Sequence, residues 1–266
     1  MDLFVRESGP VGAPAIVFLH GGERSGQSWQ PVVERMQQYR CLVPDLPQHG
    51  KSFQPEPFEM GAATIAVAEL IRSRVGAGRA HVVGLSLGAQ VGVQLLATEP
   101  TLVDRAVLCG TVINAMPALR LTAPLLGLVA RVLRFATIRR NARLVGVRSG
   151  KIDDYRDGVR LMPAAQIAHV VEASARFTLP EGLDKSDSPT LFLTGGKEMQ
   201  LTHRSAAALA QATPSGVARV ATDMRHDWPL RYPDLFSRTV NGWLTDTALP
   251  TEIVQLGSRG GRPAAQ

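Results

Sequence analysis

Short apolar runs alternate with longer amphipathic segments along most of this chain, and this alternation limits its fold more than any other feature. The runs AIVFLH, RCLVPDL, AHVVGLS, RAVLCG, PTLFLTG and GVARVAT have the length and continuous hydrophobicity of strands that are covered on both faces. Helical candidates such as MGAATIAVAELIRSRVG, LGAQVGVQLLATEP and DLFSRTVNGWL lie between or after them. This order predicts an α/β fold with a mostly parallel central sheet of about seven strands, flanked by helices, in which LFVRES forms an antiparallel edge strand.

The alternation is interrupted once, between about Met116 and Pro180. The segment ALRLTAPLLGLVARVLRFATIRRNARLVGVR looks helical throughout, and a second helical candidate, AAQIAHVVEASARF, follows it. We therefore predict a core made of residues 1–116 and 181–250, with a helical cap inserted at 117–180. For residues 251–266, which end in the Gly/Arg/Ala-rich GSRGGRPAAQ, we predict a disordered tail.

The excess of positive charge is concentrated in the expected cap. The formal net charge is +6, and residues 119–148 contain seven arginines and no acidic residue: Arg120, Arg131, Arg134, Arg139, Arg140, Arg143 and Arg148. The simplest interpretation is the solvated side of an amphipathic helix, while a membrane-surface contact and attraction of anionic substrates stay open. Nucleic-acid binding is not expected, because no aromatic interleaving or known module accompanies the charge.

Cysteine usage and hydropathy narrow the class of protein further. Cys41 and Cys109 both lie in strand-like runs, which predicts two buried thiols and neither a disulfide framework nor a metal site. The segment MDLFVRESG is too short and too charged for a signal peptide, and no apolar run approaches the roughly 18 residues that span a bilayer. We expect a soluble cytoplasmic protein without stable membrane insertion, as a monomer or a homodimer.

Ser86 lies where a strand gives way to a helix, between Gly84 and Gly88 in GLSLG. A sharp strand-to-helix turn lifts a hydroxyl above the sheet and crowds its neighbours, so glycine is favoured two positions before and two after. A serine nucleophile also needs a base, a group that orients the base, and donors for the oxyanion. We therefore interpret Ser86 as a candidate nucleophile.

The other parts of such a site follow other strand-like runs. HGG, at residues 20–22, would offer the backbone N–H of Gly22, which together with the N–H of Leu87 would form an oxyanion hole. Glu198 follows PTLFLTG, and His226 follows GVARVAT. Because the carboxyl ends of parallel strands share one edge of a sheet, the pattern predicts that Ser86, Glu198 and His226 lie together.

At this point the sequence resembles the α/β-hydrolase fold family over nearly its whole length except the tail. The resemblance is carried by FLHGG before Trp29, VPDLPQHGKS, GLSLG and RHDWPLRYPDLF, and the order Ser86, Glu198, His226 matches the family's order of nucleophile, acid and histidine. The inserted segment looks like the family's cap. The resemblance implies a serine hydrolase that cleaves a small-molecule carboxylic ester or a lactone through an acyl-enzyme, with no metal or organic cofactor.

Departures from the family pattern leave alternatives open. The acid is a glutamate where many relatives have aspartate, and Asp223 is a second carboxylate near His226. Relatives that are dehalogenases or epoxide hydrolases attack with aspartate, which Ser86 argues against. A carbon–carbon bond hydrolase, a cyanohydrin-type lyase and a ligand-binding relative with little turnover would each retain the same residues.

Further residues are predicted to shape the substrate pocket. Gly21, Trp228, Met199 and His169 are candidate substrate-binding residues because they lie beside catalytic candidates or in the cap. Leucines of the cap suggest a largely apolar pocket: Leu125, Leu126, Leu128 and Leu133. His20 is interpreted as a residue that orients its loop, and Asp45 as one that stabilises its loop.

Overall fold

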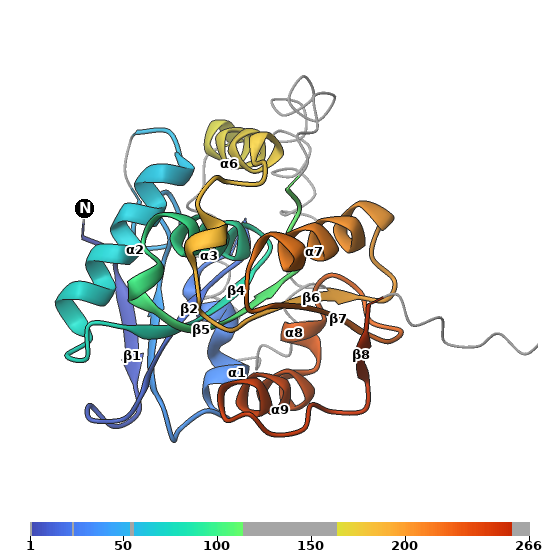
Figure 1. The fold of residues 1–266 in the computed structure, drawn as a ribbon. Coiled ribbons are helices and arrows are strands. Elements are labelled where there is room, and N and C mark those ends of the chain that lie inside the picture. Colours follow the sequence, from blue (N-terminus) through green and yellow to red (C-terminus); the bar gives the residue numbers. More distant parts are fainter. Residues whose placement is uncertain (1, 23, 54–55, 114–163, 257–266) are drawn as a thin grey trace, which may run out of the picture.

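One eight-stranded sheet organises the part of the chain that the computed structural model describes, which is residues 2–22, 24–53, 56–113 and 164–256. The strands lie in the order β1-β3-β2-β4-β5-β6-β7-β8 (Figure 1). Their bounds are β1 Val5–Ser8, β2 Ala15–Leu19, β3 Arg40–Pro44, β4 Ala80–Leu85, β5 Val103–Cys109, β6 Thr190–Gly195, β7 Gly216–Ala221 and β8 Ile253–Gln255. The strands from β3 through β7 in this order run parallel, and β1 and β8 pair antiparallel at the two edges. This confirms the predicted mostly parallel sheet and its antiparallel edge strand β1.

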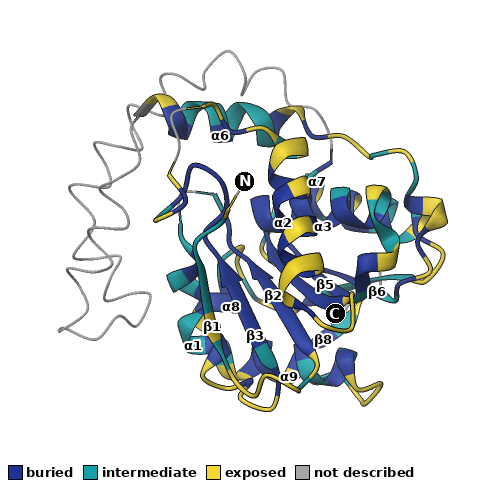
Figure 2. Cartoon of the chain, turned by 90° about the vertical axis from the view of Figure 1, so that its left-hand side faces the viewer, coloured by how far each residue is buried: buried dark blue, intermediate teal, exposed yellow. Residues whose placement is uncertain are grey.

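Helices cover both faces of the sheet because alternate side chains of each central strand point to opposite faces. In β2, Val17 and Leu19 join the core with α2 and α3, whereas Ile16 and Phe18 join the core with α1, α8 and α9. Figure 1 shows α2, α3 and α7 on one side and α1, α8 and α9 on the other, and Figure 2 shows buried strands between them. The helix bounds are η1 Gly26–Trp29, α1 Gln30–Val33, α2 Met60–Arg74, α3 Leu87–Thr98, η2 Pro100–Leu102, α6 Ala164–Arg176, η4 Leu183–Lys185, α7 Gln200–Ala212, α8 Trp228–Arg231 and α9 Pro233–Leu244.

The end of the described chain corrects one prediction, the start of the tail. The sequence predicts a disordered tail from residue 251, but β8 lies within that range and is the eighth strand of the sheet. The strand forms because Ile253 becomes buried beside Ala221 while Val254 lies opposite Val220 across the antiparallel pair. Residues 257–266 lie outside the described residues.

The structure describes only the last part of the expected cap. α6 coincides with the second helical candidate and crosses above α3 in Figure 1. Residues 117–163, with the seven arginines and the four leucines named above, lie outside the described residues. Across the described ranges, no helix combines the length and apolar character that a membrane span requires.

Candidate active site

Ser86 connects β4 to α3 in a backbone conformation that non-glycine residues rarely adopt. Its φ is 54° and its ψ is −113°, which is a strained region for an L-residue. Its N–H donates to the carbonyl of Cys109 at 2.8 Å, and its own carbonyl accepts the N–H of Gln90 at 3.0 Å. These two bonds fix the turn that presents the hydroxyl.

The two glycines beside Ser86 allow α3 to approach the sheet closely. A Cβ atom on Gly84 would lie 2.7 Å from the carbonyl oxygen of Gly88, and a Cβ atom on Gly88 would collide with the carbonyl oxygen of Leu19. Neither neighbour is the end of a flexible side chain, because both atoms belong to the backbone. The spacing of GLSLG is therefore a packing requirement of this turn.

The loop after β2 lies against Ser86 and the first residue of α3. A Cβ atom on Gly21 would lie 3.6 Å from Cβ of Ser86, and one on Gly22 would lie 3.9 Å from Cβ of Leu87. The helix N-terminus adds positive potential at this position, since its first N–H groups have no partner within the helix. The geometry thus brings together the loop and the helix start that were predicted to supply the oxyanion donors.

His20 holds this loop through both ring nitrogens. Its Nε2 accepts the N–H of Leu46 at 2.9 Å, so Nδ1 carries the proton and donates to the carbonyl of Gly21 at 2.8 Å. Burial lowers the pKa of His20 to about 4, so the ring is neutral at pH 7. In a trans peptide the carbonyl and the following N–H point in opposite directions. Fixing the Gly21 carbonyl therefore also fixes the direction of the Gly22 N–H.

Glu198 and His226 form a hydrogen-bonded pair at the ends of β6 and β7. Nδ1 of His226 lies 2.8 Å from Oε2 of Glu198, and Oε1 of Glu198 accepts the N–H of Gly195 at 2.7 Å. The Glu198 side chain is 4% exposed, whereas that of His226 is 49% exposed. Asp223, the alternative carboxylate, is 86% exposed and pairs with Nζ of Lys197 at 3.2 Å.

The exit of β5 joins this pair to Ser86. A Cβ atom on Gly110 would lie 2.6 Å from Cε1 of His226, and the preceding residue, Cys109, accepts the N–H of Ser86. Burial, followed by the negative charge of Glu198, raises the pKa of the Cys109 thiol well above its ordinary value. A hydroxyl, an imidazole–carboxylate pair and backbone donors thus gather at one edge of the sheet, which are the parts that acyl transfer requires.

Hydrogen bonds of three glutamines, Gln48, Gln90 and Gln166, hold α6 above the carboxyl ends of the strands, and none of the three was predicted from the sequence. Nε2 of Gln166 donates to Oε1 of Gln48 at 2.8 Å. Gln90, one helical turn after Ser86, accepts the hydroxyl of Ser174 at 2.8 Å and donates to the carbonyl of Val112 at 2.7 Å. A buried amide in the otherwise apolar LGAQVGVQLL was the available signal.

The predicted pocket residues have different surroundings. Gly21 lies against Ser86, whereas Met199 directly precedes α7 and has 66% of its surface exposed. Trp228 is fully buried and its ring packs against Phe236, at 5.3 Å between ring centroids, so it is part of the core. His169 lines a cavity of about 460 Å³ with residues of α2, α3 and α6, and Ser86 is not among its lining residues. The substrate-binding roles of Trp228, Met199 and His169 stay predictions.

The cysteine, histidine and acidic side chains of the described ranges form no metal site. Cys41 and Cys109 are both buried free thiols, as predicted, and burial raises the pKa of Cys41 to about 12. Among the residues that the structure describes, no group of three or more His, Cys, Asp or Glu side chains is arranged to hold a metal ion.

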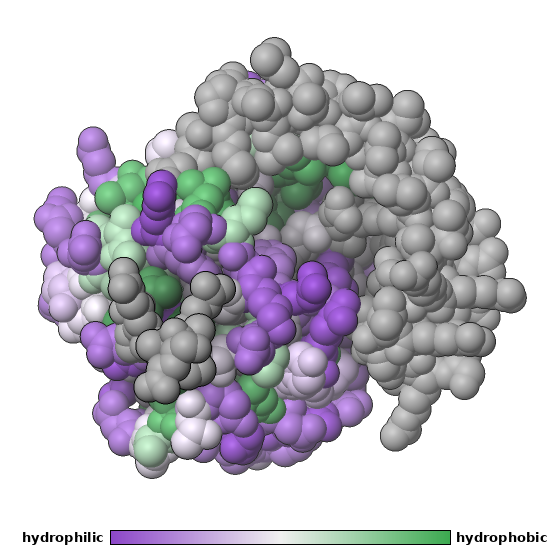
Figure 3. Space-filling view, turned by 90° about the vertical axis from the view of Figure 1, so that its right-hand side faces the viewer, coloured by the Kyte–Doolittle hydropathy of each residue, from purple (hydrophilic) through white to green (hydrophobic). Residues whose placement is uncertain are grey.

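On the face that carries α7, the described surface mixes hydrophilic and hydrophobic residues (Figure 3).

Comparisons with known proteins show which proteins this chain is similar to. A family model described as alpha/beta hydrolase fold matches residues 14–145. The crystal structure of an enol-lactonase from Burkholderia xenovorans superposes with a TM-score of 0.76 at 25% identity, covering 91% of this chain and 96% of that one. An AB hydrolase superfamily protein of Gibberella zeae is 33% identical over 110 residues, and lipase LipV of Mycobacterium tuberculosis is 32% identical over 108 residues. These matches cover 41% of this chain and 39% and 41% of the two curated relatives, so they span about two fifths of either relative's length.

Proposed function

The chain belongs to the alpha/beta hydrolase fold family, and from that premise we propose that it is a serine hydrolase that cleaves carboxylic esters. The observation that carries the proposal is the hydrogen bond between His226 and the buried carboxylate of Glu198, at the sheet edge where Ser86 occupies a strained turn. A strained backbone at a half-buried serine is typical of a nucleophile, because an ordinary surface serine has no need of it.

In the proposed reaction, Oγ of Ser86 attacks the ester carbonyl carbon while Nε2 of His226 takes the hydroxyl proton. The N–H groups of Gly22 and Leu87 stabilise the tetrahedral oxyanion. The C–O bond to the alcohol then breaks, and the alcohol leaves with the proton from His226. Water, activated by the same imidazole, attacks the acyl-enzyme and releases the carboxylic acid with Ser86 restored.

Glu198 is suited to orient His226 because its two carboxylate oxygens have different partners. One oxygen is held by the N–H of Gly195, which leaves the other directed at Nδ1 of His226. A buried carboxylate in this position fixes the tautomer of the imidazole and stabilises the imidazolium that forms during attack. Asp223 lacks such support, since its carboxylate pairs with Lys197 at the surface.

Lactones are a second candidate substrate class, favoured by the similarity to the enol-lactonase structure. A lactone is a cyclic ester, so attack by Ser86 and stabilisation of the oxyanion would proceed in the same way. The difference is that the leaving alkoxide remains attached to the acyl group. A substrate series that contains both classes separates the two candidates.

The proposal is tested by the hydrolysis of p-nitrophenyl esters from acetyl to palmitoyl, together with a lactone. Ser86→Ala should lower kcat by about 10⁴-fold or more, because the nucleophile is lost. Ser237→Ala, whose hydroxyl bonds the carbonyl of Asp234 in α9, is the matched control. Glu198→Gln should lower kcat by roughly 10³- to 10⁴-fold.

The matched control for Glu198→Gln is Asp223→Asn, which should leave kcat unchanged. If Ser86→Ala keeps its activity, the serine mechanism is wrong. If Asp223→Asn is inactive and Glu198→Gln is active, the acid has been assigned to the wrong carboxylate.

A further inference from the structure

Gly195, the last residue of β6, is hydrogen-bonded to Glu198, the partner of His226. Its N–H donates to Oε1 of Glu198 at 2.7 Å, and its carbonyl accepts the N–H of Glu198 at 3.0 Å. The glycine and the glutamate are therefore locked into one tight turn. Any movement of the Gly195 peptide groups would carry the carboxylate with it.

The same glycine also touches the loop that carries His226. A Cβ atom on Gly195 would lie 2.6 Å from the carbonyl oxygen of Met224 and 2.9 Å from that of Arg225. The N–H of Lys197 donates to the Met224 carbonyl at 2.8 Å. The turn after β6 and the loop after β7 are therefore packed closely against each other at Gly195.

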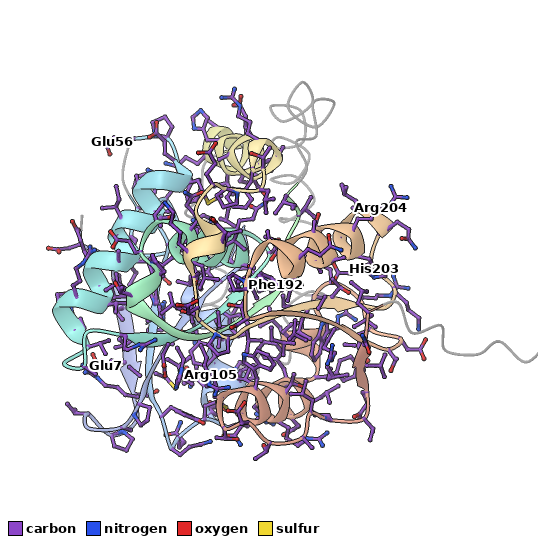
Figure 4. The ribbon with its side chains drawn as sticks, in the orientation of Figure 1. Glu7, Glu56, Arg105, Phe192, His203 and Arg204 are labelled. Atoms are coloured by element: carbon purple, nitrogen blue, oxygen red, sulfur yellow. The ribbon has the colours of Figure 1, made fainter. Side chains whose placement is uncertain are left out.

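His203 is the side chain that ties this turn to a helix. Its Nε2 lies 2.9 Å from the carbonyl oxygen of Gly195, and because a carbonyl only accepts, Nε2 carries the proton and donates it. The residue lies in α7 and is half-buried, whereas its neighbour Arg204 is exposed. Figure 4 shows His203 on the side of α7 nearer the strands and Arg204 on the outer side.

We propose that His203 is a positioning residue, which holds the Gly195 carbonyl so that the carboxylate of Glu198 stays at Nδ1 of His226. This inference rests on the proposed function, because it assigns His203 to the same catalytic pair. His203 acts through the turn and through Glu198. Two ion pairs lie close by: Lys197 pairs with Asp223 between the two loops, and Asp227 pairs with Arg231 of α8, while Arg225 is exposed.

The proposal predicts a change in catalysis with a definite sign. If the turn loosens, the Glu198 carboxylate orients the imidazole less well and stabilises less the imidazolium that forms during attack, so kcat decreases. Substrate binding does not involve His203, so KM stays unchanged. A role limited to packing α7 would lower thermal stability without lowering kcat at an unchanged KM.

The experiment compares His203→Gln, His203→Asn and His203→Leu in ester hydrolysis between pH 5 and pH 9, with thermal unfolding of each variant. Glutamine places an amide N–H near the position of Nε2, whereas asparagine is one methylene too short and leucine has no donor. We expect the Asn and Leu variants to lose roughly fivefold to tenfold in kcat, and the Gln variant to retain most of it. Arg204→Ala, on the same helix turn, is the control that should behave as the wild type.

Two outcomes would overturn the positioning role. One is a His203→Leu variant whose kcat matches that of the wild type. The other is a set of Gln, Asn and Leu variants that all lose thermal stability equally and all keep the wild-type kcat. If the Leu variant fails to fold, the comparison of Gln with Asn still decides, because both are carboxamides of nearly equal polarity.

Glu198→Gln separates this proposal from the proposed function. An active Glu198→Gln variant would refute the assignment of the acid, whatever the His203 variants show. An inactive Glu198→Gln variant beside an unaffected His203→Leu variant would refute the positioning role alone. In the double variant, His203→Leu should add no further loss in kcat, because its effect passes through Glu198.

Discussion

At the scale of single residues, His20 and His226 show how different surroundings give the same type of side chain different roles. His20 is fully buried with both ring nitrogens bonded to backbone, and burial lowers its pKa to about 4, so it remains a fixed neutral support for the Gly21 carbonyl. His226 is half-exposed and has a carboxylate at Nδ1, which leaves Nε2 as the ring nitrogen for proton transfer. The partners of the ring, rather than its place in the sequence, separate a structural histidine from a candidate base.

The depressed pKa of His20 predicts a stability that decreases in acid. Between pH 6.5 and about 4 the unfolded chain binds a proton at this residue and the folded chain does not, so the free energy of unfolding falls as the pH falls. The loss from this residue is at most roughly 3 kcal/mol. In urea unfolding at pH 7 and pH 4.5, His20→Gln should therefore show a smaller loss between the two pH values than the wild type. A loss as steep in the variant as in the wild type would contradict this.

At the scale of elements, the approach of α3 to the sheet determines where Ser86 lies. The helix starts directly after the strained turn, and its second residue, Gly88, passes the end of β2 so closely that no side chain fits. Nine of its twelve residues are buried, which fixes the helix as part of the core. The nucleophile candidate is thus positioned by a helix that has almost no freedom to move, which suits a preorganised site.

Gly88→Ala should destabilise the protein strongly, whereas Gly61→Ala should not. The added methyl group at Gly88 would collide with the backbone of Leu19, and we expect a loss of about 3 kcal/mol or more in the free energy of unfolding. Gly61 lies exposed in α2 with nothing within 4 Å of its Cβ position, so alanine there should gain roughly 0.5 to 1 kcal/mol. Urea denaturation measures both, and a Gly88→Ala variant as stable as the wild type would show that the helix can shift.

At the scale of the whole molecule, the two edge strands of the sheet are both antiparallel to their neighbours. β1 pairs with β3, and β8 pairs with β7 over residues 253–255. The N–H of Thr222, which follows β7, also donates to the carbonyl of Glu252 at 2.9 Å. β8 therefore covers the strand that leads to the loop of His226. An uncovered β7 would present free N–H and carbonyl groups for pairing with other chains.

A truncation after Pro250 should lower the melting temperature by several degrees and promote aggregation, because β7 loses its neighbour. A truncation after Leu256 keeps β8 and is the matched control. Thermal unfolding and light scattering of the two proteins give the comparison. Equal melting temperatures and equal scattering would mean that β8 contributes nothing to the edge.

The sequence alone was sufficient for the order of the elements and for the list of candidates at the site. Strands that are buried on both faces are apolar runs, whichever helices cover them. The spacing of GLSLG reflects a local steric requirement at Gly84 and Gly88. Because the carboxyl ends of parallel strands always share an edge, chain order also grouped Ser86, Glu198 and His226 before any contact was known. Each of these inferences depends on local geometry or on a general rule of parallel sheets.

Tertiary structure alone decided the burial and the hydrogen-bond partners of the polar and aromatic side chains around the candidate site. Trp228 and Met199 stand close to the candidates in sequence, yet one is in the core and the other faces solvent. The partners of Gln90 and Gln166 lie 84 and 118 residues away, and His203 matters through the carbonyl of Gly195. Hydrogen bonds and burial depend on which surfaces come into contact when the chain folds. The periodicity of the sequence does not predict these long-range contacts.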